Sequence, residues 1–138
     1  MALETTIERL DDPAGVTVIA LDGELDASNF ESLIETVQAE RAAGAERLIL
    51  DLAAMRFMAS SGLVALHSIV RIMRGEAPLD TESGWSSLHA TAPPDGEERQ
   101  TSVILCGAQP GVERVLGRTG LDRMFHVHPD RATAIAAL

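Results

Sequence analysis

The chain has 138 residues, of which 46% are hydrophobic and 23% are charged, and its formal net charge is −10. This composition is typical of one globular domain, here residues 1–138, because it is too apolar for a disordered chain. The negative charge argues against direct nucleic-acid binding, and the lack of a signal-peptide pattern or of roughly 18 consecutive apolar residues predicts a cytoplasmic protein without membrane insertion.

Two strands and a helix are predicted in the first third of the chain. Residues 16–21 are β-branched or apolar at every position, which is typical of a central strand covered on both faces, and residues 3–10 can pair beside them as an edge strand. Ser28 and Glu31 have the spacing of a capping box. They predict a helix that starts near Phe30 and ends at Gly44.

A pair of serines opens the next predicted helix. Residues 47–52 hold a short apolar run that predicts another buried strand. Ser60, Ser61 and Gly62 follow it, and apolar residues then recur at helical spacing until Gly75. The serines therefore lie where a strand passes into a helix.

Residues 75–101 differ in composition from the rest of the chain. They contain three glycines, three prolines, six acidic residues and one arginine, with little hydrophobic periodicity. Loops longer than about 15 residues are uncommon within compact domains. We therefore expect a long, flexible acidic loop inserted after the second helix.

Regular structure is predicted again from residue 103. Residues 103–106 read as a strand that ends in Cys106, the only cysteine, whose apolar neighbours predict an inert buried thiol. Pro110 is placed as the first residue of a helix that stops at Gly120, and residues 125–127 and the segment after Pro129 predict a last strand and helix. The alternation predicts an α/β fold with a mixed sheet of four to five strands and about four helices.

Three chemical readings of the sequence are weak. A hydrolase nucleophile elbow centred on Ser61 would need glycines where Ala59 and Leu63 stand. His126 and His128 could ligate a metal, but no third ligand has a characteristic spacing. The glycines of residues 107–111 match no phosphate-binding motif. We expect no enzymatic activity, no cofactor and no metal.

The serine pair has a structural and a functional reading. Serine is a favoured helix N-cap, so one serine can be explained by capping alone. The second, Ser61, can present its hydroxyl to an incoming protein. Phosphorylation there adds roughly −1.5 to −2 charge, which the helix N-terminus tolerates but an acidic or apolar partner surface does not.

Four segments give the chain a family resemblance. They are residues 21–26 (LDGELD), 48–52 (LILDL), 58–63 (MASSGL) and 119–122 (TGLD). In order and spacing they resemble the STAS domain (sulphate transporter and anti-sigma factor antagonist), particularly its small free-standing bacterial antagonists. The resemblance covers nearly the whole chain except residues 75–101.

This resemblance implies a partner-switching protein in transcription regulation. The unphosphorylated antagonist would bind an anti-sigma factor of the histidine-kinase-like ATPase type, and that partner, a serine kinase, would phosphorylate Ser61 and so be released. A PP2C-type phosphatase would reverse the modification. The resemblance places Asp26, Ser60, Ser61, Gly62 and Leu63 at the binding surface.

One departure from the family pattern keeps an alternative open. The family usually has an aspartate where this chain has Ala59. Losing that carboxylate favours a second hypothesis, a phosphorylation-independent STAS scaffold or constitutive binding module in a bacterial signalling complex. A serine hydrolase is the third and most remote hypothesis.

Overall fold

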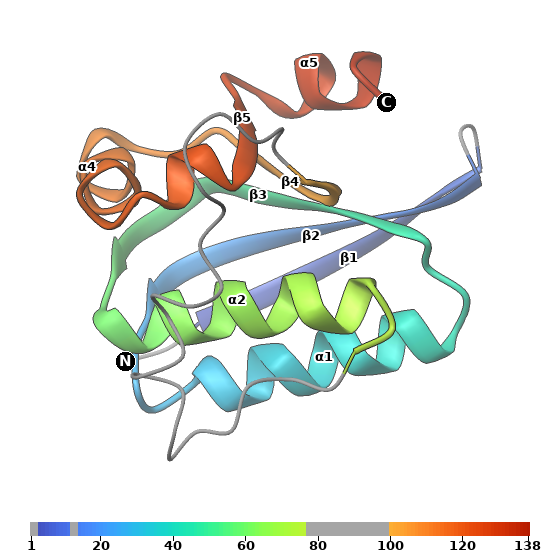
Figure 1. Ribbon diagram of the computed structural model, residues 1–138, viewed down its shortest axis with the longest axis horizontal. Helices are drawn as coiled ribbons and strands as arrows, with labels where there is room; N and C mark the ends of the chain where they lie inside the picture. Colours follow the sequence, from blue (N-terminus) through green and yellow to red (C-terminus); the bar gives the residue numbers. More distant parts are fainter. Residues whose placement is uncertain (1–2, 12–13, 77–99) are drawn as a thin grey trace.

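A five-stranded mixed sheet organises the molecule (Figure 1). The structure is a computed structural model that describes residues 3–11, 14–76 and 100–138. The strands lie in the order of the chain: β1 (Leu3–Asp11), β2 (Ala14–Leu25), β3 (Arg47–Met58), β4 (Gln100–Cys106) and β5 (Phe125–His128). β1 is antiparallel to β2, and every other neighbouring pair is parallel, which confirms the predicted mixed sheet.

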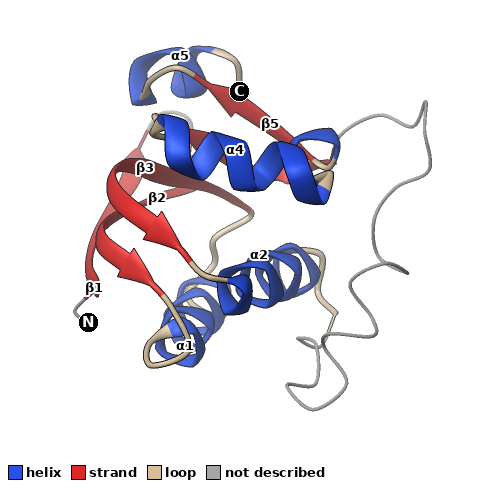
Figure 2. Cartoon of the chain, turned by 90° about the vertical axis from the view of Figure 1, so that its left-hand side faces the viewer, coloured by secondary structure: helices blue, strands red, loops and turns tan. Residues whose placement is uncertain are grey.

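Helices cover both faces of this sheet. They are α1 (Phe30–Ala42), α2 (Ser60–Met73), α4 (Pro110–Thr119), the 3₁₀ turn η1 (Leu121–Arg123) and α5 (Arg131–Ala136). Figure 1 shows α1 and α2 side by side beneath the sheet and α5 above it, and Figure 2 shows the same arrangement from the side. Within the described ranges, no helix has the length and hydrophobicity of a membrane span.

Two apolar clusters hold these layers together. The larger one packs α1, α2 and α4 against one face of the sheet and includes Leu48 and Leu50 of β3. The smaller one lies beneath α5 and includes Ile49 and Cys106. Side chains of a strand alternate between its faces, so neighbouring residues of β3 enter different clusters. Cys106 is buried, as predicted, and this burial raises the pKa of its thiol to about 11.

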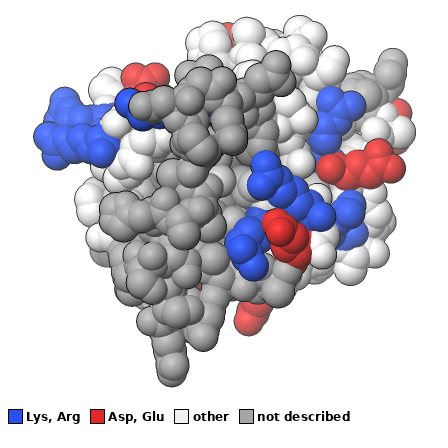
Figure 3. All heavy atoms as spheres, in the orientation of Figure 1, with Lys and Arg blue, Asp and Glu red and all other residues white. Residues whose placement is uncertain are grey.

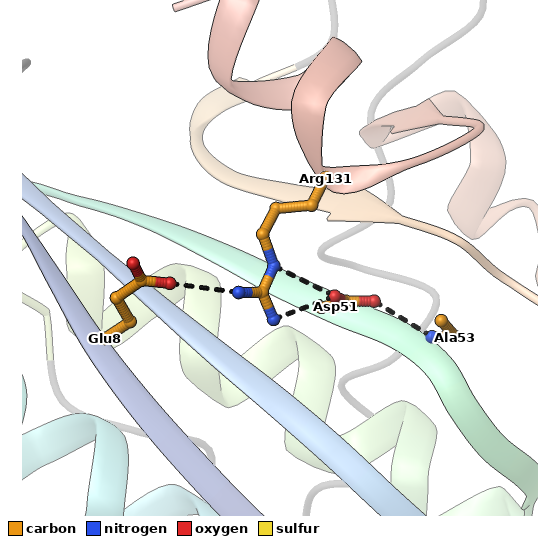
Figure 4. A network of polar contacts seen from close by, with 4 residues as sticks. All are labelled: Glu8, Asp51, Ala53 and Arg131. Carbon is orange, nitrogen blue, oxygen red and sulfur yellow. Dashed lines mark hydrogen bonds and ion pairs between the residues drawn. The ribbon is translucent and has the colours of Figure 1, made fainter.

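An ion-pair network ties α5 to two strands (Figure 4). The Arg131 guanidinium contacts the Asp51 carboxylate of β3 at 3.0 and 3.1 Å and the Glu8 carboxylate of β1 at 3.0 Å. Asp51 also accepts a hydrogen bond from the Ala53 backbone N–H at 3.0 Å. One arginine therefore anchors the last helix to strands that lie far apart in the sequence.

Several local signals are confirmed, and one is wrong. Pro110 is the first residue of α4, and Gly120 ends that helix with φ +77°, a conformation that glycine adopts without strain. The capping box is not formed. Asn29 is the N-cap of α1, and Ser28 instead donates from its backbone N–H and its hydroxyl to the Asp26 carboxylate. The acidic insertion expected at 75–101 falls almost entirely on 77–99, outside the described residues.

Candidate functional site

The predicted site residues lie at the ends of β2 and β3. Leu25 and Met58 are partners in the parallel β2–β3 pairing, and the Ala59 N–H donates to the Leu25 carbonyl at 2.8 Å. This bond holds the turn that begins at Asp26 beside the first turn of α2. The fold therefore brings Asp26 close to the serine pair, although they are far apart in the sequence.

Ser61 is not exposed, which corrects the expectation from the sequence. Its exposed fraction is 7%, its Oγ atom is sealed from solvent, and this hydroxyl has no hydrogen-bond partner among the residues that the structure describes. The reason is its position on the helix. Ser61, Ala65 and Ser68 have the spacing of one helix face, and all three are buried.

Ser60 is the exposed member of the pair. It is the first residue of α2, and the N-cap Ala59 supplies no side-chain hydrogen bond to the helix start. Successive residues of a helix point about 100° apart, so a step of one residue moves the hydroxyl from the core to the surface. Sequence reasoning identified both serines, but it assigned the outward direction to the wrong one.

Gly62 packs closely against the residues beneath the start of α2. A Cβ atom at this position would stand 2.4 Å from Met58 Cγ and 3.1 Å from Leu25 Cδ2. The first distance is too short for a methyl group unless Met58 moves, and the second requires Leu25 to give by a few tenths of an ångström. The glycine therefore lets the first turn of α2 approach the ends of β2 and β3.

Asp26 orders the neighbouring turn. The two hydrogen bonds that its carboxylate accepts from Ser28 lower the pKa of Asp26 below its ordinary value. Asn29 completes the turn, since its side-chain oxygen accepts from the Asp26 backbone N–H at 3.0 Å. Asp26 is thus an ionised, half-buried group at the edge of the site, held by local contacts.

A shallow groove runs from the start of α2 to α4. Its lining comes from β3 and α2 (Phe57, Met58, Ala59, Ser60 and Leu63) and from α4 (Val115, Arg118 and Thr119). Phe57 is 51% exposed, more than any other large apolar side chain among the described residues. The sequence did not single out Phe57 or Arg118, because neither belongs to a recognisable motif and the groove forms only in the fold.

The geometry gives no support to hydrolysis or metal binding here. A catalytic serine needs a general base within hydrogen-bond reach, and in the described part of the chain neither serine hydroxyl has one. The rings of His126 and His128 stack with centroids 6.5 Å apart, but the described segments contain no group of three or more side chains suited to hold a metal.

Comparison with known proteins finds one matching family model. The family model of the STAS domain matches residues 9–76. An anti-sigma factor antagonist from Mycobacterium paratuberculosis has a similar structure, with a TM-score of 0.67 and 26% identity over 99% of this chain and 93% of that one. No curated protein sequence matches this chain significantly.

A second similar protein is known in two states. The anti-sigma factor antagonist SpoIIAA in its unphosphorylated form has a TM-score of 0.67 and 21% identity, over 97% of this chain and 95% of that chain. The Bacillus SpoIIAA in its phosphorylated form has a TM-score of 0.62 and 18% identity, over 97% and 98%. At these identities the likeness concerns the fold.

Proposed function

Because this chain is a STAS-domain protein, we propose that it acts as an anti-sigma factor antagonist, a protein-binding module whose partner docks on the surface around the start of α2. The predicted partner is an anti-sigma factor of the histidine-kinase-like ATPase type. Such a role needs a binding surface and no catalytic group of its own. It also agrees with the cytoplasmic location expected from the sequence.

The observation that carries this proposal is the exposed apolar patch beside Ser60. Phe57 and Leu63 line one groove with Ser60 at the sheet end where Asp26 also lies. Aromatic side chains are enriched among the residues that dominate binding energy at protein interfaces. A half-exposed Phe57 next to a half-buried Leu63 is therefore suited to a protein partner.

The switch in this proposal is phosphorylation of the serine pair, which the family resemblance assigns to Ser61. A phosphate dianion at this position would face the partner surface and weaken binding by repulsion and desolvation. Because Ser61 Oγ is sealed in the folded chain, a kinase could reach it only after the first turn of α2 opens. A PP2C-type phosphatase would then restore the binding form.

A phosphorylation-independent binding module is the second candidate. Two observations favour it: Ser61 Oγ is sealed, and Ala59 replaces the carboxylate that the family usually has beside the acceptor. In this case the same surface binds a partner in a bacterial signalling complex without being switched.

Titration calorimetry against a purified anti-sigma ATPase from the same cell tests the docking surface. We expect Phe57→Ala to weaken binding about tenfold or more, because removal of an interface hot spot costs about 2 kcal/mol. Val127→Ala is the matched control, since Val127 is also an exposed apolar side chain, 36% exposed, but lies on β5. Equal affinities for both variants and the parent would contradict the proposed surface.

The same assay separates the two candidates. The parent is incubated with the ATPase and ATP, repurified and titrated again. A lower affinity that phosphatase treatment restores supports the switch. An unchanged affinity supports the constitutive module.

A further inference from the structure

β5 forms an open edge of the sheet, on the side opposite to β1. In the described sheet it pairs with β4 alone, and Figure 2 shows it running between α4 and α5. The Gly107 N–H, directly after β4, donates to the His128 carbonyl at 3.0 Å, so the backbone groups of His128 face β4. Backbone groups of successive strand residues point to opposite sides, and those of Val127 therefore face away from the sheet.

An exposed apolar side chain and two hollows lie along this edge. Val127 is 36% exposed, and the two hollows share Val127 and Asp122 in their linings. We call them together the β5 edge site. Its other described lining residues are Phe125, His126 and His128 of β5 and Glu113 and Leu116 of α4.

The charged side chains of the β5 edge site are carboxylates. Glu113 and Asp122 belong to its described lining, which includes no lysine or arginine. Glu113 forms no ion pair with any residue that the structure describes. Figure 3 shows basic side chains at the upper left, the side on which α4 lies in Figure 1, so positive charge is close to this helix without lining the site. A cation brought to the edge would therefore meet a carboxylate.

The β5 edge site is separate from the groove that begins at α2. Glu113 and Leu116 of α4 line the edge site, whereas Val115 and Arg118 of the same helix line the groove. At about 100° per residue, Val115 and Arg118 lie roughly 200° and 140° around the helix from Glu113. The two surfaces therefore lie on different sides of α4.

We propose that the β5 edge site binds an extended, basic segment of a second partner protein, which adds to the sheet as a strand beside β5. Its backbone pairs with the outward groups of Val127, and an aliphatic side chain covers Val127. A lysine or arginine two positions away reaches Glu113, because side chains two positions apart lie on the same face of a strand. This inference goes beyond the proposed function and does not depend on it.

Charge favours this occupant over a second copy of the chain. Antiparallel pairing of two β5 strands about Val127 would bring Glu113 and Asp122 of both copies near one seam. Each copy also carries a formal net charge of −10. Like charges that meet across an interface weaken binding, whereas a basic segment complements the same carboxylates.

Selection from a phage-displayed library of short random peptides tests the site. The full chain is the bait, and each enriched peptide is then synthesised and titrated. We expect peptides with a lysine or arginine two positions from a valine, isoleucine or leucine. Glu113→Gln should weaken their binding about two- to fivefold, because one exposed ion pair is lost. Val127→Arg should weaken it at least about tenfold, since it adds a like charge and removes the apolar contact.

Glu35→Gln is the matched control for net charge, because Glu35 is an exposed carboxylate on α1. It should leave the peptide affinity unchanged. Enrichment of no basic peptide overturns the inference, and so do equal affinities for the parent and Val127→Arg.

Amide hydrogen exchange at Val127 tests the mode of binding. An N–H that faces solvent exchanges readily, and pairing with a new strand slows its exchange. We expect a saturating peptide to slow exchange of the Val127 N–H at least about tenfold. The same peptide with N-methyl groups on the amides that face β5 is the control and should not slow it. A bound peptide that leaves the Val127 rate unchanged overturns strand addition.

Titration of the peptide-saturated protein with the anti-sigma ATPase separates this inference from the proposed function. We expect the affinity of the peptide-free protein, because the two surfaces lie on different sides of α4. Competition between peptide and ATPase overturns the assignment of a second surface. If the ATPase binds neither form while the peptide binds as expected, the proposed function fails and the inference stands.

Discussion

At the scale of single residues, the two adjacent serines have opposite environments. Ser60 is exposed in a groove, whereas Ser61 is 7% exposed and its hydroxyl has no hydrogen-bond partner in the described part of the chain. A buried hydroxyl without a partner costs about 1 to 3 kcal/mol. Replacing Ser61 by alanine would remove that cost. The buried hydroxyl of Ser61 therefore lowers the stability of the first turn of α2, and its presence is not explained by stability.

Thiol labelling distinguishes the two positions. In Ser60→Cys the new thiol should react with a maleimide at a rate near that of a free cysteine, and in Ser61→Cys at least about tenfold more slowly, because only thiolates that solvent can reach react readily. The parent is the background control, since its only cysteine, Cys106, is buried with a pKa of about 11. Equal labelling rates would contradict the orientation of α2.

The sequence predicted this site only in part, for a physical reason. The motif located the serine pair, Gly62 and Leu63, because a strand, two serines and a helical apolar stripe are local features. The direction of each hydroxyl depends on the rotation of α2 about its axis. That rotation is fixed by contacts such as Gly62 against Met58 and Leu25, which no local pattern reveals.

At the scale of elements, a buried carboxylate joins α1 to the edge strand. Glu40 is 5% exposed and accepts hydrogen bonds at 2.9 and 3.0 Å from the guanidinium of Arg9 on β1. Its carboxylate also lies 3.5 Å from the Thr17 hydroxyl of β2. In the described sheet β1 pairs with β2 alone, so this contact and the ion pair of Glu8 with Arg131 both add to the attachment of the edge strand.

The Glu40 contact makes stability depend on pH. The hydrogen bonds from Arg9 hold the pKa of Glu40 below its ordinary value of 4.5. Its contribution is therefore complete at neutral pH and is lost as the pH falls below about 4.5 through the lowered folded value. We expect Glu40→Gln to lower the free energy of unfolding by about 1 to 3 kcal/mol at pH 7, because hydrogen bonds to a charged group are lost.

Urea unfolding between pH 7 and pH 3 checks this expectation. The difference between parent and Glu40→Gln should shrink as the pH falls. Glu35→Gln is the matched control, because Glu35 is exposed on the same helix. A difference that stays constant with pH would show that the ionised form of Glu40 does not stabilise the fold.

Ion pairs of Arg131 link the last helix to the sheet. α5 has only six residues and covers the smaller apolar cluster, which includes Cys106. Without the contacts of Arg131 to Asp51 and Glu8, α5 should open locally more often. We expect Arg131→Ala to raise the rate of Cys106 modification by a thiol reagent several-fold.

Arg114→Ala serves as the control for this measurement, since Arg114 lies on α4 and has no ion pair with a described residue. The thiol reagent is used under native conditions, so that the rate reports local opening and not global unfolding. A Cys106 rate in Arg131→Ala that equals the parent rate would mean that apolar packing alone holds α5.

At the scale of the whole molecule, the sequence predicted the order of the elements better than their lengths. The strand expected at 16–21 is the fully covered middle of β2, where apolar residues occupy both faces. β3 continues to Met58, six residues past its expected end at Leu52. Residues 53–57 are mostly exposed, so they lack the apolar run that indicates a buried strand.

The extension of β3 comes from pairing and not from its own side chains. Its later residues pair in parallel with the end of β2, for example Ala54 with Asp22 and Met55 with Gly23. Pairing of this kind joins residues far apart in the chain, and single-sequence patterns do not contain it. The extended β3 ends at Met58, two residues before the start of α2 at Ser60. The extension of β3, which the sequence did not predict, therefore positions the site.

The sheet divides the apolar core into two clusters, one on each face, and substitutions in each cluster can test this arrangement. Ile49 and Leu50 are neighbours on β3 and are both completely buried, but they lie in the smaller and the larger apolar cluster respectively. Truncation of a buried aliphatic side chain to alanine costs about 2 to 5 kcal/mol, and the cost rises with the cavity that remains. The cost therefore reports how rigidly each cluster is enclosed.

We expect Leu50→Ala to be the more destabilising of the two substitutions. Leu50 lies in a cluster formed by three helices and the sheet, where little can move to fill a cavity. Ile49 lies beneath the six-residue α5, which can settle toward the sheet and recover part of the lost contact. The midpoints and slopes of urea unfolding measure both losses. A larger loss for Ile49→Ala would show that α5 encloses its side of the sheet as rigidly as α1, α2 and α4 enclose theirs.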